Sequence, residues 1–249
     1  MKHVELQPGE RIDQLYQNHI QIIQSDEVFS FSLDAVLLAN FAQVKQSAKT
    51  QIVDLCAGNG AVGLFLSPKT RGQITEIEIQ ARLCDMARRS VQLNQLENQV
   101  HVQHADLNQS LQFFAKETVD TVTVNPPYFP VQATSRKNPN EYLAIARHEL
   151  KTNLGEVVST ASELLKPGGK LFMVHRPDRL LEILTTLKSQ RLAPKQLQFV
   201  YPRANRDANM VLIAARKDGQ VAGLKVQPPL IVYDQDHYTP AVRKLLYGN

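Results

Sequence analysis

The fold is decided by the stretch Gln51-Ile-Val-Asp-Leu55, Cys56-Ala-Gly-Asn-Gly60 and Ala61-Val-Gly-Leu-Phe-Leu66. The first five residues are an apolar strand-like run, the next five a glycine-rich turn, and the last six open a helix that Pro68 ends. Glycines at a strand-to-helix turn let the backbone approach a ligand closely, and the helix beside the turn offers unpaired N–H groups. The stretch therefore predicts the first half of a βαβ unit with a ligand at its turn.

The same alternation of strand and helix continues downstream. Further strands are expected at 73–79, 100–103, 119–124 and 170–175, with a terminal strand pair at 195–201 and 209–216. Helices are expected at 80–94, 108–117, 152–165 and 177–189. Strands separated by helices indicate an α/β fold, a mostly parallel seven-stranded sheet with an antiparallel terminal strand pair.

The flanking segments give weaker signals. Alternation over 19–24 suggests a strand, and Ser32 is a suitable N-cap for a helix at about 33–42. Residues 129–150 begin with an aperiodic stretch, 129–140, which we expect to be a long, mobile loop. The tail contains an apolar segment, 229–233, that could add an edge strand or a cap. We expect a single domain, 1–249, in which residues 1–49 cover a core at 50–216 and residues 217–249 pack on that core.

Composition narrows the class of protein. The chain has 249 residues, 43% of them hydrophobic and 21% charged, which is ordinary for a globular domain. No apolar run approaches the roughly 18 residues of a membrane helix, and the N-terminus lacks the apolar core of a secretory signal. Cys56 and Cys84 have no ligand-like spacing and predict reduced thiols in the cytoplasm. A net charge of +4 suits a nucleic-acid partner without establishing one.

Asn125-Pro126-Pro127-Tyr128 follows the expected fourth strand. Two prolines cannot donate backbone hydrogen bonds, so the strand stops and the chain leaves it in a stiff, extended form. The amide at one end can accept from a planar amino group while the ring at the other end stacks on its plane. The same four residues would also serve as an ordinary turn, so the choice depends on the rest of the chain.

Glu78 lies eighteen residues beyond Gly60, at the end of the second strand. In nucleotide-binding βαβ units, an acidic residue at this place accepts hydrogen bonds from the ribose hydroxyls. Gly58, Gly60 and Gly63 also give the register of a dinucleotide site, so the glycines alone leave the nucleotide open.

The succession of Asp54, Glu78, Asp106 and Asn125-Pro126-Pro127-Tyr128 resembles the class I S-adenosylmethionine-dependent methyltransferases, which have a Rossmann-like fold, over roughly residues 50–215. The resemblance implies that Asp54 helps to hold the methionine ammonium of S-adenosylmethionine, Glu78 its ribose and Asp106 its adenine amine. The implied cofactor-binding set is Asp34, Asp54, Cys56, Ala57, Gly58, Asn59, Gly60, Glu78, Ile79, Asp106, Leu107 and Asn125. Cys56 departs from the family, which often has glycine there, and a positive φ would strain it.

Asn-Pro-Pro-Tyr resembles the motif of amino-group methyltransferases, which act on adenine N6, cytosine N4 or glutamine N5. The resemblance implies a catalytic set of Asn125, Pro126, Pro127 and Tyr128. In it the Asn125 amide oxygen and the Pro126 carbonyl accept the two amine hydrogens, and Tyr128 stacks on the base. No strong general base is required, and no metal: His101 and His104 are three apart and fall on opposite faces of a strand.

Motifs from about residue 10 to 240 resemble the bacterial tRNA (adenine-N6) methyltransferases that modify the adenine 3′ of the anticodon, adenine-37, in valine tRNA. They are F-x-x-D-A-V-L-L-A (31–39), D-L-C-A-G-N-G-A-V-G (54–63), N-P-P-Y-F (125–129), A-R-H-E (146–149), H-R-P-D-R-L (175–180) and P-P-L-I-V-Y (228–233). The implied partner is tRNA, a monomer is favoured, and the candidate phosphate contacts are Arg136, Lys137, Arg147, His148, Arg176 and Arg179. Alternatively, half of these are solvated surface charges, with Arg176 and Arg179 pairing with Asp178 or Glu182.

Three other functions remain open from the sequence. A protein glutamine-N5 methyltransferase of the release-factor type shares the motif, although such enzymes usually carry a helical N-terminal domain where this chain shows strand-like alternation. Another rRNA or DNA amino methyltransferase also fits. A non-catalytic cofactor- or RNA-binding module is the third, and the intact Asn125, Asp54 and Glu78 speak against it.

Overall fold

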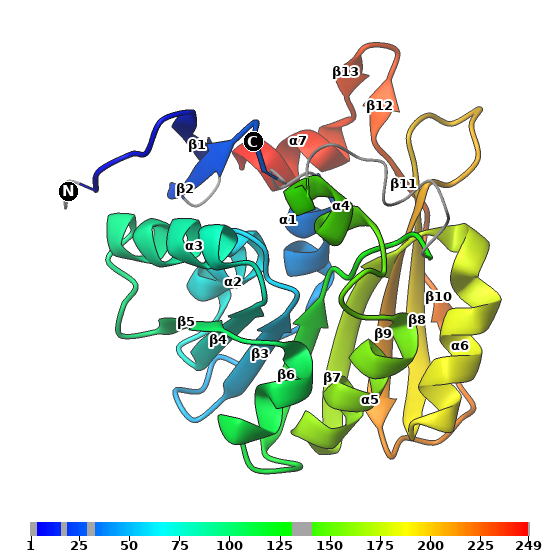
Figure 1. The fold of residues 1–249 in the computed structure, drawn as a ribbon. Helices are drawn as coiled ribbons and strands as arrows, with labels where there is room; N and C mark the ends of the chain where they lie inside the picture. The colour runs from blue at the N-terminus through cyan, green and yellow to red at the C-terminus, as the bar shows by residue number, and fades with distance from the viewer. Residues whose placement is uncertain (1–3, 16–18, 29–32, 131–140, 249) are drawn as a thin grey trace.

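A central β-sheet organises the computed structural model, which describes residues 4–15, 19–28, 33–130 and 141–248. Its long strands run in the order β5 (Val100–His104), β4 (Gln73–Glu78), β3 (Gln51–Leu55), β6 (Val119–Val124), β7 (Leu165–His175), β9 (Met210–Lys217) and β8 (Leu192–Tyr201) (Figure 1). In this series β9 runs antiparallel to both β7 and β8, and the other neighbouring pairs are parallel. The predicted seven-stranded sheet with an antiparallel terminal pair is confirmed. Two-residue strands β10 (Lys225–Val226) and β11 (Leu230–Ile231) extend its edge at β8.

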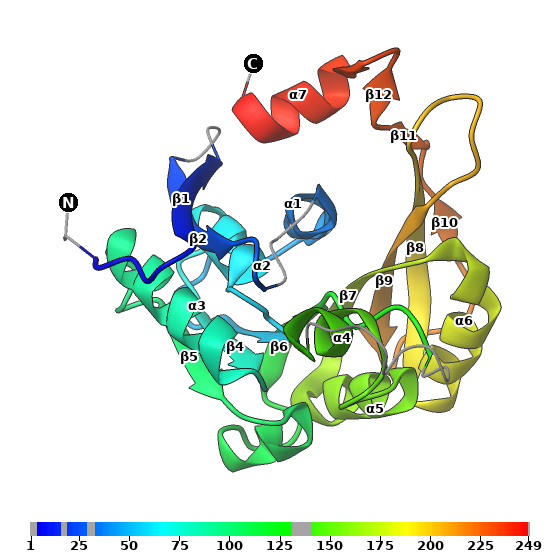
Figure 2. The same ribbon diagram turned by 45° about the horizontal axis from the view of Figure 1, so that its top comes forward.

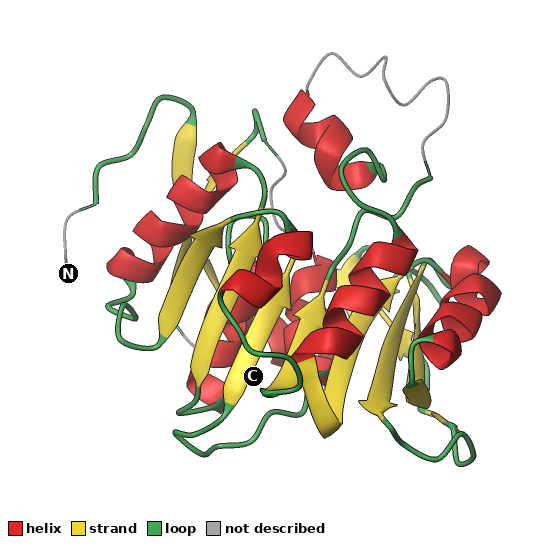
Figure 3. Cartoon of the chain, turned by 60° about the horizontal axis from the view of Figure 1, so that its bottom comes forward, coloured by secondary structure: helices red, strands yellow, loops and turns green. Residues whose placement is uncertain are grey.

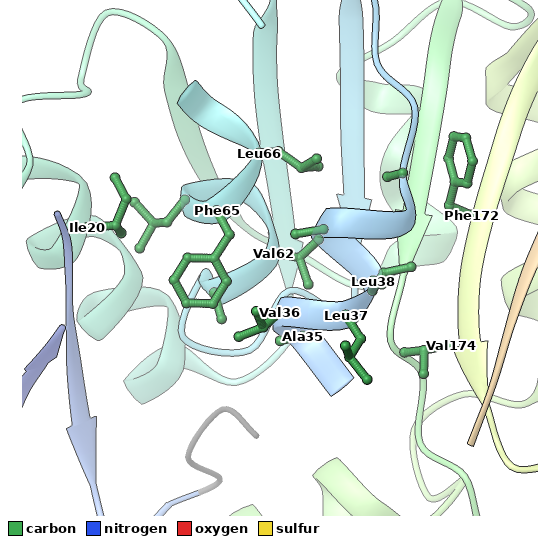
Figure 4. Close-up of a cluster of buried hydrophobic side chains, with 14 of the residues drawn as sticks. Ile20, Ala35, Val36, Leu37, Leu38, Val62, Phe65, Leu66, Phe172 and Val174 are labelled. Carbon is green, nitrogen blue, oxygen red and sulfur yellow. The ribbon is translucent and has the colours of Figure 1, made fainter. Parts of the chain in front are cut away.

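Helices cover both faces of this sheet (Figure 3). These are α1 (Leu33–Phe41), α2 (Ala61–Leu66), α3 (Ala81–Leu93), α5 (Leu154–Leu164) and α6 (Leu180–Ser189). Helix α4 (Glu141–Arg147) lies beyond the strand ends, and α7 (Pro240–Tyr247) packs against α1 (Figure 1). Side chains alternate along β7: Phe172 and Val174 pack with α1 and α2, whereas Leu171 and Met173 pack with α5 and α6. Figure 4 shows Phe172 and Val174 on the α1 side of the sheet. Two apolar layers therefore hold the sheet rigidly between them.

An N-terminal hairpin packs beside α2 and α3 (Figure 2). It consists of β1 (Glu10–Leu15), which the sequence pattern did not predict, and β2 (Ile20–Ser25), which it did. Backbone groups of β2 bond to α3: the Asn94 amide pairs with Gln21, and Ser90 Oγ accepts from the Ile23 N–H at 2.9 Å. These bonds hold the hairpin against the helix that follows Glu78.

Several predicted boundaries differ from the structure. The helix expected at 108–117 is a 3-10 helix at Leu107–Gln112. The strand expected at 170–175 begins earlier, because residues 165–169 form the irregular start of β7, where the register with β6 shifts. Of the loop expected at 129–140, residues 131–140 lie outside the described part, and residues 141–147, which follow it, form α4. Helix α7 was not predicted, although its N-cap Thr239, Pro240 at its first position and Gly248 after its end are the usual signals. Across 4–15, 19–28, 33–130 and 141–248, we find no helix with the length and apolar character of a membrane span.

The order of the strands creates a crevice. The chain runs from β3 outward to β4 and β5, and then returns to β6 on the other side of β3. β3 and β6 are parallel neighbours, so their carboxyl ends meet while the segments that follow them diverge. Ligands of open α/β sheets bind at such a switch point. The glycine turn follows β3 and Asn125 follows β6, so both predicted motifs flank it.

Candidate active site

A cavity of about 300 Å³ opens at the carboxyl ends of β3, β4, β5 and β6. Its lining includes thirteen of the residues predicted for the site: Asp34, Cys56, Ala57, Gly58, Asn59, Glu78, Ile79, Asp106, Leu107, Asn125, Pro126, Pro127 and Tyr128. Asp54 and Gly60, also predicted, are buried next to the cavity but do not line it. The structure thus gathers residues from five separate parts of the chain around one pocket.

The glycine turn has the strained geometry anticipated at Cys56, whose φ is 55°. Gly58 (φ 60°) and Gly60 (φ 84°) are also left-handed, and Gly60 is the N-cap of α2. A Cβ on Gly58 would meet no atom within 4 Å, so this glycine leaves room beside the backbone. A Cβ on Gly60 would stand 2.6 Å from Glu76 Oε2, so this glycine is required by the buried side chain beneath it.

Glu78 joins the end of β4 to the glycine turn. Its Oε2 accepts from the Gly58 N–H and its Oε1 from the Gln80 N–H, each at 2.8 Å. Burial raises the pKa of this carboxyl, while the backbone hydrogen bonds oppose the rise. The side chain is therefore held in one position at the wall of the cavity, with its remaining lone pairs available to a ligand.

Asp54 is the penultimate residue of β3, below the cavity. Its Oδ1 accepts from the Thr123 hydroxyl of β6 at 2.6 Å, while its Oδ2 is buried with no partner in the described parts of the chain. Burial raises the pKa of Asp54 to about 7. A buried carboxyl oxygen that lacks a donor beside the cavity fits a role toward a cationic group of a ligand, directly or through water.

Apolar and acidic groups alternate along the cavity wall near β4 and β5. Ile79, Leu83 and Leu107 supply apolar surface, and Glu78 and Asp106 supply carboxylates. Asp106 is the N-cap of a 3-10 helix and accepts from the Asn108 N–H at 2.9 Å, which fixes its orientation. Apolar walls with a few placed acceptors are the pattern of a small-ligand site, here suited to a nucleoside with its hydroxyls and amine.

The Asn125–Tyr128 segment is braced on three sides. The Tyr128 hydroxyl lies 2.7 Å from Asp34 Oδ2 and 2.6 Å from Asn125 Oδ1. The Tyr128 ring lies 5.1 Å from the His175 ring at 49°. His175 is fully buried, which lowers its pKa to about 4, and its Nδ1 accepts from the Arg176 N–H. Arg179 donates to the Tyr128 carbonyl at 3.2 Å. The amide and the ring are thus held firmly at the cavity.

The residues predicted to contact phosphates lie in different environments. Arg136 and Lys137 lie outside the described residues, and Arg147 ends α4. Arg176 is 39% exposed, lies 5.1 Å over the Phe129 ring and pairs with Asp178. The His148 ring is 5.7 Å from that of Phe129. Phe129, His148 and Arg176 form what we call the mouth cluster.

Arg179 has a different environment from Arg176. Its side chain is 11% exposed and bonds to Glu149 at 2.8 Å and to Glu182 at 2.6 Å. Two carboxylates and the Tyr128 carbonyl already take its donors, which leaves little for a phosphate. Arg179 therefore fits the alternative given above, in which it pairs with the nearby Glu182. Its contacts indicate that it holds the Tyr128 backbone in place.

Sequence reasoning missed the part of the cavity contributed by α4 and the residues after it. Ile145 and Ala146 of α4, with Lys151 and Thr152, line the cavity together with Gln80 and Leu83. The Arg82 guanidinium lies 5.7 Å over the Tyr142 ring and so connects α4 to α3. Leu143, Ala144 and Ala146 favour a helix by their intrinsic propensity, but a helix of seven residues is too short to show an apolar periodicity.

His101 and His104 do not converge. His101 Nε2 contacts Gln73 Oε1 at 2.9 Å, and His104 Nε2 contacts the Ile79 carbonyl at 3.0 Å. In the described part of the chain, no three His, Cys, Asp or Glu side chains form a metal-binding group.

Comparisons with known proteins agree with this geometry. Residues 19–190 match the family model described as "Methyltransferase small domain". A tRNA1(Val) (adenine(37)-N6)-methyltransferase of Phocaeicola vulgatus is 25% identical over 181 residues, 73% of this chain and 74% of that protein. A release factor glutamine methyltransferase of Bifidobacterium longum is 31% identical over 147 residues, 52% of this chain and 50% of that protein.

Solved structures show the same fold. A predicted O-methyltransferase of Agrobacterium tumefaciens superposes with a TM-score of 0.67 and 26% identity, over 86% of this chain and 96% of that one. A geranyl diphosphate methyltransferase in complex with SAM superposes with a TM-score of 0.56 and 16% identity, over 74% and 84%. The fold is that of the class I methyltransferases.

Proposed function

This chain belongs to the methyltransferase small domain family, and we propose that it is an S-adenosylmethionine-dependent tRNA methyltransferase that modifies N6 of adenine-37 in valine tRNA. One observation carries the proposal. Asn125-Pro126-Pro127-Tyr128 follows β6 directly and lines the same cavity as Glu78 and Asp106. The Asn125 amide, which can accept from a planar amine, therefore lines the same cavity as two carboxylates that can bind a nucleoside. The name and coverage of the Phocaeicola vulgatus relative support tRNA as the substrate.

The residues present fit S-adenosylmethionine. Glu78 would accept from the ribose hydroxyls and Asp106 from the adenine amine, while Ile79 and Leu107 flank the adenine ring. The unpartnered Oδ2 of Asp54 would receive the methionine ammonium through water. The bound cofactor supplies a methyl group already activated by a positively charged sulfur.

The protein's part in the reaction is to position the target amine. The Asn125 amide oxygen and the Pro126 carbonyl would accept its two hydrogens, which draws the nitrogen lone pair out of conjugation with the ring. Because the two prolines stiffen the backbone, both acceptors keep a fixed separation. Such preorganised acceptors stabilise the charge that develops on the amine as the new carbon–nitrogen bond forms. The surplus proton leaves to solvent after transfer.

The mouth cluster suits the RNA around the target base. Phe129 lines the cavity and is 38% exposed, and Arg176 and His148 lie against it. An exposed ring beside a guanidinium offers stacking for an unpaired base and charge for a phosphate. The loop of a tRNA anticodon presents unpaired bases, so turning one out of the stack costs less than in a duplex.

The direct test uses purified protein, labelled S-adenosylmethionine and transcribed valine tRNA. We expect label in the tRNA and N6-methyladenosine by nucleoside mass spectrometry, and no label when adenine-37 is replaced by guanine. Label that persists in the guanine-37 transcript would contradict the assignment of adenine-37 as the methylated base. In tRNA from cells that lack the protein, the same nucleoside should disappear from valine tRNA.

A protein glutamine-N5 methyltransferase is the second candidate, because a glutamine amide also presents a planar amine to Asn125. The Bifidobacterium longum relative supports it, but only half of each chain aligns. Parallel reactions with tRNA and with a peptide release factor separate the two. Label in the release factor alone would favour this candidate, whereas cofactor binding with no label in either substrate would favour a non-catalytic module.

A further inference from the structure

Asp34 is linked to the predicted acceptor, Asn125, through the Tyr128 hydroxyl. The side chain belongs to the first turn of α1, is 6% exposed, and accepts from the Ala35 N–H at 3.0 Å through Oδ1. Its other oxygen, Oδ2, lies 2.7 Å from the Tyr128 hydroxyl. On the far side, Asn125 Oδ1 lies 2.6 Å from the same hydroxyl. The three residues thus form a continuous chain from α1 to the acceptor amide.

With Asn125 Oδ1 toward Tyr128, the phenol hydrogen is the one hydrogen between the oxygens of Asp34, Tyr128 and Asn125. Burial and the neighbouring Asp34 raise the pKa of Tyr128 well above its usual value, so the phenol keeps its single hydrogen. Given to Asn125 Oδ1, that hydrogen would occupy the oxygen needed for the target amine. Given to Asp34, it forms the stronger, charge-assisted bond. Two lone-pair oxygens would then face each other at 2.6 Å between Tyr128 and Asn125.

A half-turn of the Asn125 amide removes that repulsion. The oxygen and the NH₂ group of an asparagine exchange places when the amide turns, and the hydrogen-bond partners decide the orientation. With Nδ2 toward Tyr128, the amide donates to the phenol oxygen and the phenol donates to Asp34. The Asn125 oxygen is then turned away from Tyr128 and available to another donor.

We propose that Asp34 is a positioning residue for amine transfer, and that its carboxylate sets the orientation of the Asn125 amide through the Tyr128 hydroxyl. This inference rests on the proposed function, because it needs a target amine that donates to Asn125. It assigns to Asp34 a role toward the acceptor amide, distinct from the cofactor contact that the family resemblance implies.

Asp34→Asn reverses the chain of hydrogen bonds. The new amide can donate to the phenol oxygen, which directs the phenol hydrogen to Asn125 Oδ1 and occupies the acceptor. We expect kcat for tRNA to fall about 10- to 100-fold, with the Kd for S-adenosylmethionine within about twofold of wild type. Asp85→Asn on α3, which also removes an acidic charge, is the matched control and should leave kcat unchanged.

A double-mutant cycle separates this role from a structural one. Tyr128→Phe keeps the ring and removes the hydroxyl, so D34N should cause no further loss of kcat in the Y128F background. The same fractional loss from D34N with and without the hydroxyl would overturn the proposal, as would a loss confined to cofactor affinity. Should D34N fail to fold, a wild-type kcat in Y128F would overturn it equally. Wild-type protein that methylates no tRNA would instead refute the proposed function.

Discussion

Glu76 lies directly beneath Gly60, and its Oε2 is 2.6 Å from where a Cβ on Gly60 would stand. The same carboxyl lies against Gly63, one turn further along α2. Glu76 is fully buried, and neither of its oxygens has a hydrogen-bond partner in the described part of the chain. The first turn of α2 therefore packs on a carboxyl group, and two glycines make that packing possible.

Gly63→Ala is expected to destabilise the protein by about 1–3 kcal/mol, because the added methyl overpacks against Glu76. Gly63 has no positive φ, so its backbone accepts alanine without strain. With Glu76→Ala present, the same change should instead stabilise by about 0.5–1 kcal/mol, the usual gain of alanine over glycine in a helix. Urea unfolding of the four proteins measures both values. A change of the same sign in both backgrounds would show that Glu76 is not the obstacle.

Glu76→Gln should remove part of the pH dependence of stability. Burial, aided by Asp54, raises the pKa of Glu76 well above its usual value, so the folded protein prefers the protonated form. That contribution is fully present below about pH 4.5 and is lost as pH rises toward the folded pKa, at about 1.4 kcal/mol per pH unit. Unfolding free energies at pH 5, 6, 7 and 8 should fall less steeply in E76Q. Parallel pH curves would argue against a protonated Glu76.

Glu78→Gln is expected to weaken cofactor binding. The change replaces a carboxylate that would accept from ribose hydroxyls, and it disturbs the Gly58 and Gln80 hydrogen bonds. Charged hydrogen bonds contribute roughly 1.5–3 kcal/mol, so the Kd for S-adenosylmethionine should rise about 10- to 100-fold. Calorimetric titration measures it, with the exposed Glu163→Gln as the control. An unchanged Kd would remove Glu78 from the cofactor site.

Asn125→Ala should separate binding from turnover. The variant loses the amide acceptor but none of the groups proposed to hold the nucleoside, so cofactor affinity should stay within about threefold of wild type. We expect kcat to fall by at least about 100-fold, as for other preorganised polar groups at reacting centres. Single-turnover methylation of tRNA measures the loss, and Asn98→Ala at an exposed site should behave as wild type. A variant with normal turnover would contradict the role of Asn125.

Arg176 and Arg179 should respond differently to replacement by alanine. Arg176→Ala removes an exposed cation of the mouth cluster, so we expect a higher KM for tRNA and a salt dependence reduced by about one phosphate contact. Arg179→Ala leaves Glu149 and Glu182 without their partner and should lower the melting temperature instead. KM across a salt series and thermal unfolding measure the two effects. If KM for tRNA depends on salt equally in R176A and wild type, the mouth cluster does not contact the RNA phosphates.

The sheet and most of the cavity could be predicted because their signals are local. A buried strand, a glycine turn and an apolar helix face are each read from adjacent residues, and strand ends in a parallel sheet meet at one edge. The position of Asp54, Glu78 and Asp106 around one crevice follows from that rule. At Cys56 the sequence indicated only that a positive φ would be strained, and the structure has that positive φ.

What could not be predicted depends on contacts between distant residues. The burial of Arg179 follows from Glu149, thirty residues earlier, and nothing near position 179 indicates that partner. In the sequence, Glu76 is one polar residue in an alternating strand and would be expected to face solvent. In the structure it is fully buried, because α2 packs against it. Helix α4 was not predicted because it has few apolar residues, and these line a cavity that forms only from distant parts of the chain.

The hydrogen bond between Asp54 and Thr123 has a consequence for how the protein becomes active. It links β3 to β6, which are separated by two further strands in the chain, next to the crevice between the two motifs. During synthesis on the ribosome, the glycine turn emerges well before its partner strand. The cofactor pocket is therefore completed only when the later half of the sheet has paired, and ligand binding during refolding reports the closure of this long-range contact rather than the formation of the first βαβ unit.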